Sequence, residues 1–141
     1  MKATLLSTAL ALATASAASA QTAVRTDRFE VDGVHVTIEY LDERIAAIQP
    51  RARALVRDAW PRLVALFGGP PQTARRTPYE AFVVTLSYGR GEGRSDPQHI
   101  TLRIAPETLV FGYSSWEDAV LHELLHFWNA NTFRVKKLLP Q

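Results

Sequence analysis

Apolar and polar residues alternate over residues 29–31 and again over residues 34–40, which is the pattern of strands with one buried face. An Asp32-Gly33 pair interrupts the alternation, and Asp-Gly is a common two-residue turn between antiparallel strands. The apolar positions on either side of this pair are Phe29, Val31, Val34, Val36, Ile38 and Tyr40. We predict a β-hairpin in which His35 lies on the solvent-facing side and is not a metal ligand.

Over residues 42–67 the apolar period changes from two residues to three or four, which indicates an amphipathic helix. The recurring apolar positions are Ile45, Ile48, Ala52, Leu55, Val56, Trp60, Leu63, Val64 and Phe67. Proline breaks or kinks a helix interior, so the segment is either one long helix or two helices separated near Pro50 or Pro61. Two glycines and two prolines then end it. We interpret the arginines of this segment as a solvated helix face.

Two strands rich in β-branched and aromatic residues are predicted next, over residues 79–88 and 99–105. Residues 89–98 between them, GRGEGRSDPQ, carry three glycines at every second position. A phosphate-binding loop would also need a following Lys and Ser or Thr at the start of a helix. We therefore expect a flexible hairpin loop or the rim of a cleft.

The last predicted helix begins at Ser114 or Ser115, because each serine has an acidic residue three positions later, as in a capping box. It continues without interruption from Trp116 to about Asn131. The order of hairpin, long helix, two strands and helix predicts an α+β fold, in which a small β-sheet packs against the long helix and the final helix.

The composition narrows the functional classes. The 141 residues suffice for one domain but not for two independent cores, and 47% hydrophobic residues exclude a disordered chain. The net charge of +2 comes from scattered residues and does not favour nucleic-acid binding. Because the chain has no cysteine, a metal ion must be held by His, Asp or Glu.

Residues 1–20 have the pattern of a secretory signal peptide. Met1 and Lys2 precede an uncharged run rich in Ala and Leu, and Ala18 and Ala20 are small residues before a cleavage point. The run is shorter and less apolar than the roughly 20 residues that a membrane anchor needs. We expect cleavage before Gln21 and export of residues 21–141 as a single domain to the periplasm or the exterior, with no membrane attachment afterwards.

The final predicted helix carries the sequence His122-Glu123-Leu124-Leu125-His126. Two His residues four apart lie on one face of a helix, so both rings can bind the same Zn²⁺ ion. Glu123 lies roughly 100° further round the helix, where it reaches a water beside the metal instead of the metal itself. Zinc acidifies such a water, and a carboxylate can take its proton as the water attacks a carbonyl.

The run His122 to Asn129, HELLHFWN, resembles the active-site helix of the gluzincin metallopeptidases. Trp128, Asn129 and Arg134 make it most similar to the glycyl-aminopeptidase-like branch. The resemblance implies a zincin fold, with His122 and His126 as zinc ligands, Glu123 as general base, and Trp128 and Asn129 supporting them. It also implies that one of the two strands before this helix, such as residues 99–105, pairs with an extended substrate.

The third zinc ligand is not evident in the sequence. Gluzincins take it from a Glu on a later helix, but Glu123 is the last acidic residue here and no His follows His126. A catalytic zinc normally has three protein ligands. Four explanations remain open: the domain is C-terminally truncated; His99 or Glu107 is the ligand; a partner chain or the terminal carboxylate of Gln141 supplies it; or the domain has lost catalysis.

The sequence thus predicts an exported, zinc-dependent metallopeptidase-like domain that hydrolyses a peptide or protein substrate and is active if a third zinc ligand is supplied. The alternative is a degenerate zincin that binds a peptide or protein without cleaving it. A third hypothesis is a small exported structural domain in which the two His residues of the motif have no common function.

Overall fold

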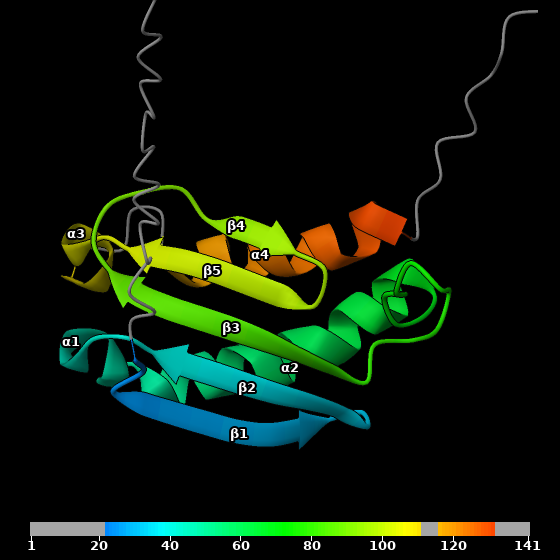
Figure 1. The fold of residues 1–141 in the computed structure, drawn as a ribbon, viewed down its shortest axis with the longest axis horizontal. Coiled ribbons are helices and arrows are strands. Elements are labelled where there is room, and N and C mark those ends of the chain that lie inside the picture. The colour runs from blue at the N-terminus through cyan, green and yellow to red at the C-terminus, as the bar shows by residue number, and fades with distance from the viewer. Residues whose placement is uncertain (1–21, 111–115, 132–141) are drawn as a thin grey trace, which may run out of the picture.

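A computed structural model of the chain describes residues 22–110 and 116–131. Five strands form one mixed sheet in the order β1-β2-β3-β5-β4 (Figure 1). The strands are β1 (Arg25–Val31), β2 (Val34–Tyr40), β3 (Ala81–Tyr88), β4 (Arg94–Asp96) and β5 (His99–Ile104). β1 pairs antiparallel with β2, and β4 pairs antiparallel with β5, whereas β3 is parallel to both of its neighbours, β2 and β5.

The hairpin predicted at the start of the domain is confirmed. Asp32 and Gly33 connect β1 to β2 with φ angles of 49° and 78°. Positive φ at both central residues is the feature of a tight turn whose twist matches that of the flanking strands. His35 is exposed, with its Nδ1 3.8 Å from a carboxylate oxygen of Glu30 on the neighbouring strand, as expected for a surface position.

Four helices accompany the sheet: α1 (Glu43–Ala46), α2 (Gln49–Phe67), α3 (Pro106–Val110) and α4 (Trp116–Asn131). The predicted helical segment is two helices, and the break falls near Pro50, which lies in the first turn of α2. Pro61 lies inside α2 and does not end it. α2 closes at Gly68, which adopts the left-handed φ of 73° that a helix C-cap favours. α3 was not predicted.

Helices α2 and α4 cover one face of the sheet, and the core lies between these two layers (Figure 1). Trp60 of α2 stacks on Phe82 of β3 with ring centroids 4.9 Å apart, and Trp128 of α4 stacks on Phe67 at 5.2 Å. Trp60 and Trp128 are themselves 5.4 Å apart. This aromatic cluster joins the two helices to each other and to the sheet, so it fixes the position of α4.

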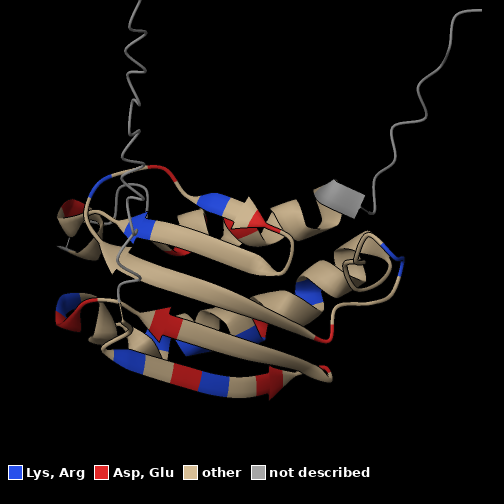
Figure 2. Cartoon of the chain, in the orientation of Figure 1, with Lys and Arg blue, Asp and Glu red and all other residues tan. Residues whose placement is uncertain are grey.

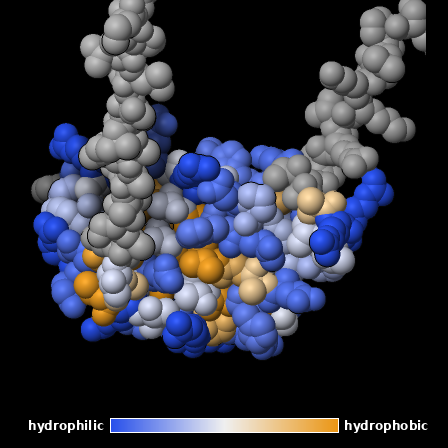
Figure 3. Space-filling model, viewed as in Figure 1, coloured by the Kyte–Doolittle hydropathy of each residue, from blue (hydrophilic) through white to orange (hydrophobic). Residues whose placement is uncertain are grey.

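The other face of the sheet is mainly hydrophilic (Figure 3). Acidic and basic residues follow one another along β1 (Figure 2). The arginines of α2 lie on a solvent-accessible face, as predicted, and two of them also form ion pairs, Arg51 with Glu117 and Arg53 with the buried Asp27. Within the described residues, no helix combines the length and the apolar character that a membrane span requires.

The observed architecture is therefore the predicted α+β fold, a small sheet packed against a long helix and the helix that carries the HExxH motif. The predicted strands over residues 79–88 and 99–105 correspond to β3 and β5. The signal peptide and the serine caps of the last helix lie outside the described residues.

Candidate metal centre

Helix α4 presents an apolar face to the core and its His pair to solvent. Val120, Leu124 and Phe127 recur at four and three residues and are almost completely buried. The first turn of the helix contains Glu117 and Asp118, whose charge favours the positive end of a helix dipole. The apolar face therefore sets the rotation of α4 about its own axis, and this rotation directs His122 outward.

His122 and His126 lie one turn apart with their rings nearly perpendicular, at an interplanar angle of 83°. Their Nε2 atoms are 3.1 Å apart, and one of them donates a hydrogen bond to the other. Two nitrogens on one tetrahedral zinc, each at about 2.0–2.1 Å, would be separated by roughly 3.3 Å. The pair is therefore spaced as two ligands of a single metal ion would be.

The Glu123 side chain completes a compact cluster. One ligand atom from each of His122, Glu123 and His126 lies within 4.8 Å of the other two, and Glu123 is only 8% exposed. The sequence prediction that these three side chains share one site agrees with this arrangement. A carboxylate beside two imidazoles, with no cysteine in the chain, is a donor set that suits Zn²⁺.

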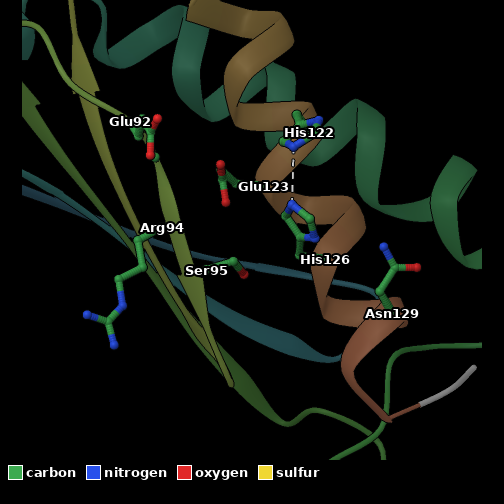
Figure 4. A pocket seen from close by; sticks show the side chains of 8 residues that line it. Glu92, Arg94, Ser95, His122, Glu123, His126 and Asn129 are labelled. Carbon is green, nitrogen blue, oxygen red and sulfur yellow. Dashed lines mark hydrogen bonds between the residues drawn. The ribbon is translucent and has the colours of Figure 1, made fainter. Parts of the chain in front are cut away.

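The cluster opens into a cleft of about 660 Å³ between α4 and β4 (Figure 4). Asn129 lines it from the helix side, one turn beyond the His pair, and Glu92 and Ser95 line it from the strand side. In Figure 4 the Glu123 carboxylate lies between the strand and the two imidazoles, whereas the guanidinium of Arg94 points away from them. Arg94 instead pairs with Asp96, at 3.1 Å between Nε and Oδ2.

Of the two residues that were predicted to support the site, one belongs to the core and one to the cleft. Trp128 is fully buried, and its indole Nε1 donates a hydrogen bond of 2.8 Å to the carbonyl oxygen of Gly69. It supports the helix and does not face the cleft. Asn129 is exposed and lines the cleft directly.

Neither upstream candidate for the third ligand lies in the cluster. His99 lies on the sheet face opposite the helices, where its Nε2 is 2.9 Å from Thr85 Oγ1. Glu107 of α3 forms an ion pair with Arg90, with 3.1 Å between Arg90 Nε and Glu107 Oε1. Among the described residues, the groups that could hold a metal together are therefore those of His122, Glu123 and His126 alone. Gln141 lies outside the described residues.

The sequence did not reveal β4, which forms the strand side of the cleft. Residues 89–98 are indeed a cleft rim, as predicted, but Arg94–Asp96 within them form the edge strand of the sheet. For residues 99–105, one of the two strands suggested as a partner for an extended substrate, β5 is paired on both sides at residues 99–101. That half of β5 has no free edge, whereas residues 102–104 pair with β3 alone among the described strands. Pro97, a residue common in tight turns, was the sequence signal that could have indicated a turn between β4 and β5. In the structure this turn includes Gln98, with a φ of 63°.

Comparison with known proteins adds information on the fold. No protein-family model matches the chain, and no curated protein matches it in sequence. The crystal structure of an aminopeptidase N family protein from Idiomarina loihiensis is similar, with a TM-score of 0.60 and 18% sequence identity. The similarity covers 82% of this chain but 20% of that protein.

At this level of identity the similarity concerns the fold. The chain has an aminopeptidase N-like α+β fold, and that fold carries a His–Glu–His cluster in HExxH order beside a cleft. The similar region corresponds to about a fifth of the length of the Idiomarina loihiensis protein.

Proposed function

We propose that the chain is an exported, zinc-dependent peptide hydrolase domain. The observation that carries the proposal is the cluster of His122, Glu123 and His126 within 4.8 Å, which lines a cleft bordered by an edge strand. The aminopeptidase N-like fold supports the same class of chemistry. Export rests on the signal-peptide pattern of residues 1–20.

His122 and His126 would hold the zinc ion, which when bound supplies Lewis-acid activation of a water molecule and of a substrate carbonyl. Glu123 would take a proton from the attacking water and pass it to the leaving amine of the peptide. The carboxylate is suited to this role because, among the described residues, no side chain or main-chain group forms a hydrogen bond or ion pair with it. Its oxygens are therefore free to accept a proton.

The edge strand β4 would bind the substrate. One edge of β4 pairs with β5, and no other described strand pairs with its opposite edge. Unpaired main-chain groups can hydrogen-bond an extended peptide as an added strand. A second cavity of about 420 Å³ shares His122 with the cleft and has Leu102, Trp116 and Ala119 in its walls. It offers room for an apolar substrate side chain next to the scissile bond.

The test uses residues 21–141 after zinc loading, on a library of fluorogenic peptides. We expect cleavage by the wild type and loss of cleavage by Glu123→Gln, with about one zinc per chain in both proteins, because the substitution removes the base and keeps both imidazoles. Zinc content by mass spectrometry is the control. A Glu123→Gln variant that retained turnover would contradict the role of the base.

A second candidate function is favoured by one observation. The described residues supply two imidazole ligands and one base, but not a third ligand. A domain that binds zinc or a peptide without hydrolysing it could have this incomplete set of zinc ligands. Saturable binding of library peptides to the wild type, with one zinc bound and no cleavage of any of them, would support this alternative over the hydrolase.

A further inference from the structure

The Glu123 carboxylate packs against the backbone of Gly93, the residue that precedes β4. An ideal Cβ atom built on Gly93 would lie 2.5 Å from Glu123 Oε1 and 2.9 Å from its Cδ. Protein Cβ atoms do not approach other atoms this closely. The space that any other residue would fill at position 93 is therefore occupied by the carboxylate itself.

The reason for glycine at this position is not conformational. Five glycines of the described chain have a positive φ, and they include Gly89 and Gly91 in the same loop but not Gly93. Its backbone conformation is therefore available to other residues, and the restriction on position 93 is steric. Besides Glu123, the built Cβ would meet Leu102 Cδ1 at 2.9 Å. Both neighbours are the ends of flexible side chains, which can move without unfolding the domain.

From these contacts we infer that Gly93 is a positioning residue for the Glu123 carboxylate. This inference rests on the proposed function. Packing against the backbone of Gly93, and not hydrogen bonding, limits where the carboxylate can lie. A base held in this way keeps both carboxylate oxygens available to a proton. The distance of the carboxylate from the His pair then depends on the absence of a side chain at Gly93.

Substitution by alanine would displace the carboxylate. Ordinary contacts begin at 3.4 Å, so Oε1 must move by about 0.9 Å from the 2.5 Å position (3.4 minus 2.5). A misplacement of about 1 Å at a reacting group can cost on the order of 100-fold in rate. We expect Gly93→Ala to lower kcat by about 10- to 100-fold, with KM changed by less than about threefold, because the edge of β4 is unaltered.

The experiment is a double-mutant cycle with Glu123→Asp, whose side chain is one methylene shorter. If Gly93 acts through the carboxylate, Gly93→Ala should reduce kcat much less in the Glu123→Asp background than in the wild type. Equal reductions in both backgrounds would overturn the inference. Thr101→Val, on the opposite face of the neighbouring β5, is the control for small changes in the strand pair and should leave kcat unchanged.

Three measurements apart from activity separate positioning from general damage. The zinc content of Gly93→Ala should match that of the wild type because the His pair is not altered, and its Tm should change little because only the flexible end of the core residue Leu102 must shift. Crystals of both proteins should show the Glu123 carboxylate displaced in the variant, and an unmoved carboxylate would overturn the inference. A zinc-loaded wild type without activity would contradict the proposed function, whereas an active wild type with an equally active Gly93→Ala would contradict this inference alone.

Discussion

Trp128 of α4 donates its indole Nε1–H to the carbonyl oxygen of Gly69, at 2.8 Å, just beyond the end of α2. Trp128 follows His126 by two residues and is fully buried. The hydrogen bond and the contacts of the same ring with Trp60 and Phe67 therefore connect α4, the helix that carries the HExxH motif, to α2. The tryptophan of the motif contributes to the site by holding its helix in place.

Trp128→Phe should lower the free energy of unfolding by about 1–3 kcal/mol, because the Gly69 carbonyl loses its partner and the smaller ring leaves a space. Urea denaturation followed by circular dichroism measures the change. Leu66→Ala, at a side chain that is 72% exposed, is the control and should change stability little. Unaltered stability of Trp128→Phe would show that the bond to Gly69 is not significant.

His126→Ala should abolish stoichiometric zinc binding, because a single remaining imidazole with one carboxylate cannot hold the ion. The wild type should bind about one zinc and gain thermal stability on adding it, since a ligand of the folded state stabilises that state. His35→Ala, on the hairpin, is the matched control. Equal zinc content in His126→Ala and the wild type would contradict the assignment of the ligands.

Arg53→Ala should destabilise the domain by about 1–3 kcal/mol, since it leaves the carboxylate of Asp27, only 5% exposed, without its cationic partner. The bond between Arg53 Nη1 and Asp27 Oδ1 is 2.8 Å long. Arg57→Ala removes an exposed arginine from the next turn of the same helix and should be nearly neutral. Similar stabilities for the two variants in chemical denaturation would show that the pair contributes little.

Asp42, the N-cap of α1, should make the free energy of unfolding depend on pH in the acid range. Hydrogen bonds from Arg44 lower the pKa of Asp42 from 3.8 to about 2. Because the folded-state pKa is lowered, the stabilisation is complete above the unfolded-state pKa and is lost as the pH falls toward the folded-state value. Between pH 3.8 and about 2, the stability difference between the wild type and Asp42→Asn should therefore shrink.

Asparagine keeps an oxygen that can cap α1, so this variant isolates the charge. The measurement is denaturant unfolding at several pH values, at low and high salt. Since Arg44 is exposed and Asp42 is partly exposed, high salt should reduce the difference at neutral pH. A difference that is constant from pH 5 to pH 2 would contradict the role of the ion pair.

The sequence pattern was sufficient wherever one residue type dictated the local geometry. Asp32-Gly33 placed the hairpin, and the two periods distinguished the strand from the helix that follows. The spacing of His122 and His126 placed both imidazoles on one helical face. In each case the information is local, so a short window of sequence contains it.

The features that the sequence did not predict depend on distant residues. β4 is three residues long and polar, and it is recognisable as a strand because β5 lies beside it. The contact of Gly93 with Glu123 joins segments 30 residues apart, and the pairing of Arg53 with Asp27 joins segments 26 apart. His99 could be excluded as a ligand only once the pairing of β5 had fixed which face of the sheet it occupies.

The two outer strands of the sheet also bear on how copies of this domain behave at high concentration. Exposed strand edges tend to pair between molecules, and short or charged edges resist this aggregation. β4 has three residues, of which Arg94 and Asp96 are charged, and Pro97 follows them; β1 at the other edge carries Arg25, Arg28 and Glu30. The outer edge of β4 can thus remain unpaired within the domain while its charges and the following proline disfavour strand pairing between copies of the chain.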